Sequence, residues 1–231
     1  MLHKEVICII PARKGSKGVR NKNIKKVKGK PLVQYSIDTA KKISNLVDIC
    51  VSTDSLNVKK IVKKNRIKFF GLRPKNLSGD FAETKDVVKY ELLKYEKQRK
   101  SKYKYILVLQ PTTPIRDIKK IKKVINLIKK NKKIDSVISI KDVEGDHPLR
   151  MKVFKNNLLQ NYSGKLNEDM RPRQKLPKVY IRSGSFYLIK RTSLMNIGSL
   201  VGKHCHGEIL YGLETVNIDN IRDLKYLEME M

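Results

Sequence analysis

Residues 6–23 read VICIIPARKGSKGVRNKN, an apolar run followed by a loop rich in glycine and basic residues. Val6–Ile10 is mostly β-branched and is bounded by Pro11, which is typical of a buried strand. Gly15 and Gly18 let the loop backbone approach a ligand closely, and backbone N–H groups after a strand suit a phosphate chain. The loop is neither a Walker A motif nor a dinucleotide fingerprint. By composition alone a basic loop is plain solvated surface, whereas its position at the carboxyl end of the first strand suits binding of a phosphate chain, so both interpretations stay open. The basic side chains that would neutralise a triphosphate are those of Arg13, Lys17, Arg20 and Lys22.

Apolar β-like runs alternate with helical patterns along most of the chain. This alternation predicts an α/β fold built from βαβ units, with a mostly parallel sheet whose ligands bind at the carboxyl ends of the strands. The expected strands are Val6–Ile10, Val47–Val51, Ile67–Phe70, Tyr105–Leu109, Asp135–Ile140, Ser185–Ile189 and Val216–Ile218. The expected helices are Pro31–Ile43, Asn57–Asn65, Glu83–Gln98, Asp117–Asn131 and Ile221–Met229.

Residues 142–180 break this rhythm, because they carry polar turns, three prolines and no helical period. We expect an arm inserted after the fifth strand. The whole chain, residues 1–231, is then one domain, which its length suits.

The net charge of +30 comes from 52 Lys and Arg against 22 Asp and Glu, and it raises the possibility of a basic nucleic-acid-binding protein. The excess is 40 lysines against 12 arginines, spread along the chain without an RNA- or DNA-reading motif. In the helix Asp117–Asn131, isoleucine and valine recur every three or four residues and lysines fill the remaining positions. This pattern predicts a solvated lysine face, so specific nucleic-acid binding is not expected.

No apolar run approaches the roughly 20 residues that span a bilayer. The first residues resemble no secretory signal, and Cys8, Cys50 and Cys205 are too far apart to form a disulfide framework. A cytoplasmic protein without a membrane partner is expected.

Nine short blocks, in order along the whole chain, are similar to those of one enzyme family. They are Arg13-x-Gly15-Ser16-Lys17-Gly18 with Lys22-Asn23, Gly29–Leu32, Val51–Asp54, Arg73-Pro74 with Leu77, Ser78 and Asp80, Leu109–Pro114, His147-Pro148, Arg171–Gln174, Gly184–Tyr187 and Asn217–Asp219. On these residues the chain resembles the acylneuraminate cytidylyltransferases, which make CMP-sialic acid or CMP-legionaminic acid.

The resemblance implies a CTP-dependent nucleotidyltransferase that couples CTP to a nine-carbon 2-keto-3-deoxy sugar acid of the sialic or legionaminic type. The products would be the CMP-sugar and pyrophosphate. It also implies a Rossmann-like three-layer sandwich whose arm crosses to a partner subunit. Residues 142–180 match that arm in place and length, so a homodimer is expected.

The resemblance assigns roles residue by residue. Arg13, Lys22 and Asp219 would be catalytic. The nucleotide would be bound by Arg13, Ser16, Lys17, Lys22, Asn23 and Arg73. Gln110 and Thr112 would face the sugar acid. Arg173 would pair with its carboxylate, a role that a planar guanidinium performs better than an ammonium group.

The expected cofactor is Mg²⁺, with Mn²⁺ as a substitute, and here the chain departs from the family. Where the family usually shows Asp-x-Asp, this sequence has Asn217-Ile218-Asp219. Alternate residues of an extended segment share a face, and Mg²⁺ prefers hard oxygen ligands, so Asp219 is the main expected ligand and Asn217 the second. Glu214 and Asp54 are alternative ligands, whereas Asp223 is better explained as the cap of the last helix.

Three alternatives remain open at the level of sequence. A pseudaminate or octulosonate cytidylyltransferase shares much of this layout. A non-catalytic sugar-nucleotide-binding relative is suggested by Asn217 alone. The third is the basic nucleic-acid-binding protein, from another class.

Overall fold

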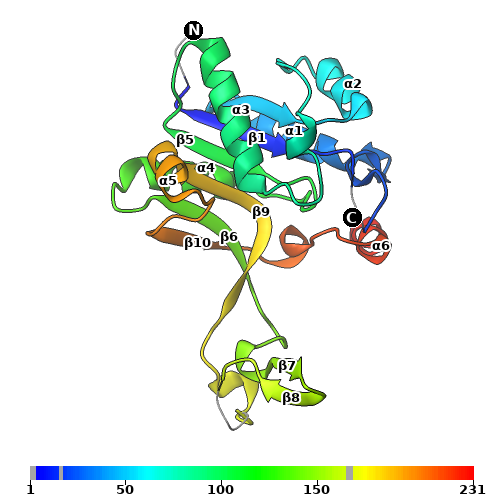
Figure 1. Cartoon of the computed structure of the whole chain (residues 1–231), viewed down its shortest axis with the longest axis vertical. Helices are drawn as coiled ribbons and strands as arrows, with labels where there is room; N and C mark the ends of the chain where they lie inside the picture. The colour runs from blue at the N-terminus through cyan, green and yellow to red at the C-terminus, as the bar shows by residue number, and fades with distance from the viewer. Residues whose placement is uncertain (1–3, 16–17, 165–168) are drawn as a thin grey trace.

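The computed structural model describes residues 4–15, 18–164 and 169–231. Within these ranges the chain forms a six-stranded central sheet with strand order β10-β6-β9-β5-β1-β4 (Figure 1). β1 pairs in parallel with β4 and β5, β10 pairs in parallel with β6, and β9 runs antiparallel between β5 and β6. The sheet is therefore mostly parallel, as predicted. Its strands are β1 (Val6–Pro11), β4 (Val47–Ser52), β5 (Tyr105–Leu109), β6 (Ser136–Asp142), β9 (Tyr180–Lys190) and β10 (Cys205–Ile209).

Helices cover both faces of the sheet, and β1 shows how the sequence arranges this. Val6, Cys8 and Ile10 pack into a core with α1, α2 and α4, whereas Ile7 and Ile9 pack into a second core with α3 and α5. Successive side chains of a strand point to opposite faces, so a continuous apolar run is suited to a strand that is buried on both sides. The Rossmann-like three-layer sandwich is thus confirmed. The helices are α1 (Leu32–Lys42), α2 (Leu56–Lys64), α3 (Thr84–Arg99), α4 (Ile118–Lys130), α5 (Arg191–Ile197) and α6 (Ile221–Glu230). None of them, within the ranges described, combines the length and apolar character needed to cross a membrane.

Two predicted strands are wrong. Ile67–Phe70 packs on α3 instead of joining the sheet: the Tyr95 hydroxyl donates to the Lys68 carbonyl at 2.8 Å, and the rings of Phe70 and Tyr95 meet edge to face. Val216–Ile218 is irregular, because the Ile218 N–H donates to the carbonyl of Thr112 in a loop. Conversely, α5 and β10 were not expected, since α5 is short and β10 is a polar edge strand.

The predicted lysine face of α4 is exposed at Lys119, Lys122, Lys123 and Lys130, and it also carries ion pairs. Three of its lysines pair with glutamates from other parts of the chain, which periodicity within one helix cannot reveal. The pairs are Lys120–Glu214, Lys123–Glu208 and Lys129–Glu5.

Residues 142–180 leave the sheet between β6 and β9, whose pairing extends to Asp142 and Tyr180 at the base of this segment (Figure 1). Beyond that base lie the short helix η3 (Pro148–Arg150), the hairpin β7–β8 (Lys152–Lys155 and Leu158–Asn161) and the short helix η4 (Arg173–Lys175). Because Ile67–Phe70 is not a strand, this arm follows the fourth strand of the sheet in chain order and not the fifth.

The C-terminal segment returns to the loop after β1. After β10, the short helix η5 (Gly212–Thr215) leads through Asn217–Asp219 into α6. Ile218 is fully buried in a small apolar cluster that includes Val19, Leu32 and Leu227. The cluster therefore fixes the predicted metal-binding residues beside the predicted phosphate-binding loop.

Candidate active site

A cavity of about 260 Å³ opens at the carboxyl ends of β1 and β5. Ligands of parallel α/β sheets bind at this edge. The cavity brings together six predicted site residues that are distant in sequence: Arg13, Lys22, Asn23, Arg73, Gln110 and Thr112. Ser16 and Lys17, the other predicted nucleotide contacts, lie outside the described residues.

The Arg13 loop is held from two sides. The Arg13 guanidinium donates to the carbonyl of Gly79 at 2.7 Å and forms an ion pair of 2.9 Å with Asp80. The Asn23 amide donates to the Arg13 carbonyl at 2.8 Å, and the Lys14 N–H donates to Asp54 Oδ1 at 2.7 Å. Asp54 therefore fixes the backbone of the loop, which argues against its alternative role as a metal ligand.

Lys22 joins the loop to the C-terminal segment. It begins a short 3-10 helix and is only 8% exposed. Its Nζ donates to the carbonyl of Ile218 at 2.7 Å and to Asp219 Oδ1 at 3.3 Å. An ammonium group has three N–H donors, so one remains for a ligand in the cavity. Among 40 lysines, Lys22 is placed to carry positive charge into the site.

Arg73 forms a wall of the cavity and is 6% exposed. It donates through Nε and Nη2 to the hydroxyl and carbonyl of Ser52, at 3.0 and 2.8 Å, and through Nη1 to the carbonyl of Leu77 at 3.3 Å. Burial lowers the pKa of its guanidinium. These contacts tie the loop around Leu77 to the end of β4, so Arg73 has a structural task besides any contact with a ligand.

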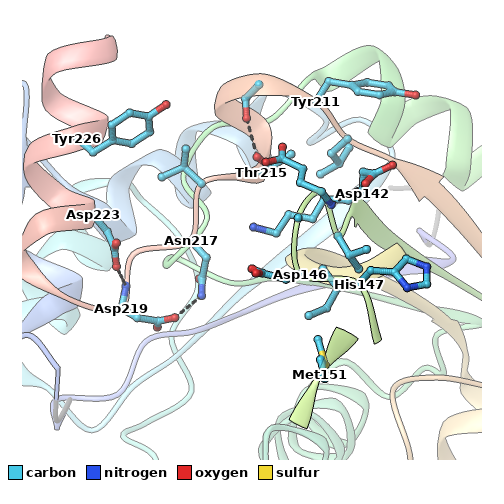
Figure 2. Close-up of a pocket in the computed structure, with 18 of the residues that line it drawn as sticks. Asp142, Asp146, His147, Met151, Tyr211, Thr215, Asn217, Asp219, Asp223 and Tyr226 are labelled. Atoms are coloured by element: carbon cyan, nitrogen blue, oxygen red, sulfur yellow. Dashed lines mark hydrogen bonds between the residues drawn. The ribbon is translucent and has the colours of Figure 1, made fainter. Parts of the chain in front are cut away.

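Asn217 and Asp219 line a second, larger cavity of about 1360 Å³ between the base of the arm and the C-terminal segment (Figure 2). The Asn217 amide donates to Asp219 Oδ2 at 2.5 Å. Asp223 accepts the Asp219 and Asn220 N–H groups at 2.7 and 2.8 Å and completes the capping box of α6 with Asn220. The expectation that Asp223 caps the last helix is confirmed. Lys22 lines the smaller cavity and contacts Asp219, so the two cavities adjoin at this ion pair.

Residues 7–197 match the family described as Cytidylyltransferase. The chain belongs to the cytidylyltransferase family. It is 29% identical over 224 residues to post-translational flagellin modification protein B of Campylobacter coli, covering 97% of this chain and 94% of the relative. It is 30% identical, with the same coverage, to CMP-N,N'-diacetyllegionaminic acid synthase of Campylobacter jejuni subsp. jejuni serotype O:2. The predicted enzyme class, a CTP-dependent nucleotidyltransferase, is confirmed.

A solved structure of CMP:2-keto-3-deoxy-manno-octonic acid synthetase with CTP shares the fold of this cytidylyltransferase. The TM-score is 0.69 at 17% identity, and the match covers 99% of this chain and 98% of the other.

Sequence reasoning missed Arg116, which organises the wall around Gln110. Its guanidinium donates to the carbonyls of Gln110 and Ser185 and to the hydroxyl of Ser36, and so joins the end of β5 and the middle of β9 to α1. Burial lowers the pKa of Arg116 to about 9. The available signal was an arginine in the loop after the predicted strand Tyr105–Leu109, in a chain with 40 lysines and only 12 arginines.

The backbone beside Gln110 requires glycine. Gly184 has φ +78°, and a Cβ there would lie 3.0 Å from Gln110 Oε1. Thr113 and Ser185 place buried hydroxyl groups nearby that have no hydrogen-bond partner within the described structure. These polar groups lie behind Gln110, which itself lines the smaller cavity.

The predicted sugar-acid contact Arg173 lines neither of these two cavities, although its ion-pair partner Asp142 lines the larger one. It lies in η4 on the arm, is exposed, and its Nη2 is 3.7 Å from Asp142 Oδ1. The remaining alternative ligand, Glu214, is also engaged: it accepts from the Asp117 N–H at 3.0 Å and pairs with Lys120. In the part of the chain described, no group of three or more His, Cys, Asp or Glu side chains is arranged to hold a metal ion.

Proposed function

We propose that this cytidylyltransferase transfers CMP from CTP to a nine-carbon 2-keto-3-deoxy sugar acid of the sialic or legionaminic type, with release of pyrophosphate. The observation that carries the proposal is the cavity that unites Arg13, Lys22, Asn23, Arg73, Gln110 and Thr112. The full-length similarity to a CMP-N,N'-diacetyllegionaminic acid synthase supports the choice of sugar.

In the proposed reaction, the anomeric 2-hydroxyl of the sugar acid attacks the α-phosphorus of CTP, and pyrophosphate leaves in line. Such transfers depend mainly on positioning and charge neutralisation. Arg13 and Lys22 would neutralise the triphosphate and the departing pyrophosphate. Asn23 and Arg73 would contact the ribose and base, and Gln110 and Thr112 would orient the sugar.

We propose Asp219 as the main Mg²⁺ ligand and Asn217 as the second. The side chain of Asp219 is 69% exposed, and both residues carry hard oxygen donors, so the pair fits a cation that takes its other ligands from phosphate and water. Asn217 directs its NH₂ group at Asp219, so its amide must turn to offer oxygen. When bound, Mg²⁺ or Mn²⁺ would supply charge neutralisation at the α-phosphate.

We also propose a homodimer formed through the arm. The hairpin β7–β8 exposes apolar side chains on a two-stranded ribbon, which is marginally stable alone in water. Phe154, Leu158 and Leu159 are 71%, 68% and 68% exposed. A second copy would cover them, and its arm would bring Arg173 to the cavities that this residue does not line in its own subunit.

The test measures pyrophosphate release in the presence of Mg²⁺. Each of the four ribonucleoside triphosphates is combined with a panel of nine-carbon and eight-carbon sugar acids. We expect CTP together with a sialic or legionaminic acid to give the highest kcat/KM. Preference for an octulosonate or a pseudaminate would refute the proposed sugar. Equal turnover of all four nucleotides would refute the preference for CTP, and no turnover with any acid would favour a non-catalytic relative.

A further inference from the structure

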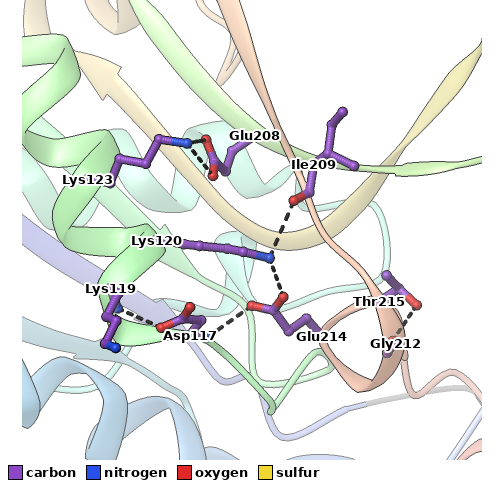
Figure 3. Close-up of polar contacts among 9 residues, drawn as sticks. All are labelled: Asp117, Lys119, Lys120, Lys123, Glu208, Ile209, Gly212, Glu214 and Thr215. Carbon is purple, nitrogen blue, oxygen red and sulfur yellow. Dashed lines mark hydrogen bonds and ion pairs between the residues drawn. The ribbon is translucent and has the colours of Figure 1, made fainter.

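We propose that Glu214 and Lys120 are positioning residues that hold the Asn217–Asp219 segment in register with Lys22. The inference rests on the proposed role of Asp219 and adds two residues with no assigned part in the reaction. Figure 3 shows the contacts that carry it: Glu214 on η5 lies against the first turns of α4.

Glu214 divides its carboxylate between two partners on α4. Oε1 accepts the N–H of Asp117, the N-cap residue, at 3.0 Å, and Oε2 pairs with Lys120 Nζ at 2.5 Å. The two side chains are shielded, with exposures of 16% for Glu214 and 24% for Lys120. A shielded ion pair is screened less by water than an exposed one, so these contacts define one position of η5 against α4.

The pair acts on the site through a short piece of chain. Ile218 and Asp219 follow Glu214 by only four and five residues, and the Ile218 N–H donates to the Thr112 carbonyl at 2.7 Å. Thr112 lines the smaller cavity, and the Ile218 carbonyl accepts from Lys22. The other polar contacts recorded within η5 are local, such as the Thr215 hydroxyl with the Gly212 carbonyl. Glu214 is therefore a long-range polar anchor of η5, upstream of the contact between Ile218 and Thr112.

Lys120 also contacts a residue that lines the larger cavity. Its Nζ lies 5.5 Å from the ring centroid of Tyr211, and Tyr211 lines the cavity that Asn217 and Asp219 also line. The contact is a cation–π interaction on the face of the ring. One lysine thus supports both the carboxylate that anchors η5 and an aromatic side chain at the cavity wall.

The neighbouring pair Lys123–Glu208 supplies a matched control. Lys123 lies one turn further along α4, and its Nζ contacts both Glu208 oxygens at 2.9 and 3.0 Å (Figure 3). Glu208 belongs to β10 and its side chain is 8% exposed. Both pairs join α4 to the C-terminal part of the chain, but Glu208 is in the sheet and lies farther from Asp219 along the sequence.

The experiment compares Glu214→Gln and Lys120→Met with Glu208→Gln in the full chain. Glu214→Gln keeps an oxygen for the Asp117 N–H, removes the charge and puts an NH₂ group in place of the oxygen that accepts from Lys120. The first measurement is hydrogen exchange of the Ile218 amide. The second set comprises kcat, the KM for CTP, the half-saturating Mg²⁺ concentration and the melting temperature.

We expect both variants to accelerate exchange at Ile218 roughly tenfold. We expect kcat to fall roughly 10- to 100-fold, because small displacements of a reacting group cost rate steeply, and half-saturating Mg²⁺ to rise. Glu208→Gln should lower the melting temperature at least as much while leaving exchange at Ile218, kcat and the Mg²⁺ requirement near wild type. Lys120→Arg should restore most of kcat.

Unchanged exchange at Ile218 in Glu214→Gln, or faster exchange with normal kcat and Mg²⁺ dependence, would overturn the proposal. An equal loss of kcat in Glu208→Gln would overturn it as well, since general destabilisation would then explain the effect. The experiment separates failure of this proposal from failure of the proposed function. If the wild-type chain is inactive with every sugar acid, hydrogen exchange at Ile218 still shows whether Glu214 and Lys120 hold the segment in place.

Discussion

Replacement of Lys22 by methionine tests the centre of the proposed site. Methionine keeps most of the side-chain volume at this buried position and removes the ammonium group. The change deletes the hydrogen bonds to the Ile218 carbonyl, at 2.7 Å, and to Asp219 Oδ1, at 3.3 Å. It also removes the positive charge that we place beside the departing pyrophosphate.

Two separate effects are expected, one on the free energy of unfolding and one on kcat/KM. The Ile218 carbonyl is buried with its residue, so loss of its charged donor should reduce the free energy of unfolding by about 1.5–3 kcal/mol. Loss of a preorganised donor that stabilises transition-state charge costs at least about 2.7 kcal/mol, which is roughly a 100-fold fall in kcat/KM. The loss should fall mainly on kcat, because charge on the leaving group grows in the transition state.

The assay is pyrophosphate release at 25 °C under conditions where the variant is shown to be folded by its melting curve. Lys122→Met is the control, since Lys122 is exposed on α4. We expect the control to retain wild-type kcat/KM. If Lys22→Met and Lys122→Met both lose less than about threefold, a difference below roughly 0.7 kcal/mol, the charge role of Lys22 is wrong.

Four further predictions address the metal, the loop, the arm and the net charge. Asp219→Asn should lower activity about 100-fold with partial recovery in excess Mg²⁺ or Mn²⁺, and Asn217→Asp should lower half-saturating Mg²⁺ without raising kcat; unchanged Mg²⁺ titrations would place the metal elsewhere. Gly18→Ala should lower kcat about tenfold or more, as measured by pyrophosphate release, because a Cβ at Gly18 would overlap the Asp219 carbonyl and misplace that residue. Phe154→Asp should give a monomer by analytical ultracentrifugation, whereas Leu56→Asp, at a similarly exposed position on α2, should not. Nucleic-acid binding by filter retention should be weak, indifferent to sequence and lost as salt is raised; salt-resistant, sequence-selective binding would contradict this.

The part of the fold that could be predicted from sequence is the part with strong periodicity. The strand Tyr105–Leu109 has its predicted bounds, β1 differs by one residue at its end, and α4 differs by one residue at each end. These segments are apolar runs or amphipathic stripes whose burial alone fixes their type. Ile67–Phe70 is also mostly apolar, yet its Phe70 packs against the ring of Tyr95 on α3 and the segment joins no sheet. A strand needs a free neighbour in a sheet, and local sequence does not say whether one exists.

The site was predictable to the extent that its residues follow strand ends. Gln110 and Thr112 after β5 and the loop after β1 must meet at one edge of a parallel sheet, and they do. The roles of Glu214 and Arg116 were not predictable in this way. Glu214 acts through Lys120 on another element, and Arg116 acts through the carbonyls of Gln110 and Ser185, so their significance depends on tertiary contacts.

The abundance of lysine explains why charge alone did not identify the functional residues of this chain. Lys22, Lys120 and Lys122 look alike in a sequence with 40 lysines, but they differ in what surrounds the ammonium group. Lys22 is buried against a carbonyl and a carboxylate beside a cavity, Lys120 is shielded against a glutamate and a tyrosine ring, and Lys122 is exposed. The free energy of a charge depends on its partners and its desolvation far more than on residue type. A net charge of +30 is therefore compatible with a site whose chemistry rests on only a few of these cations.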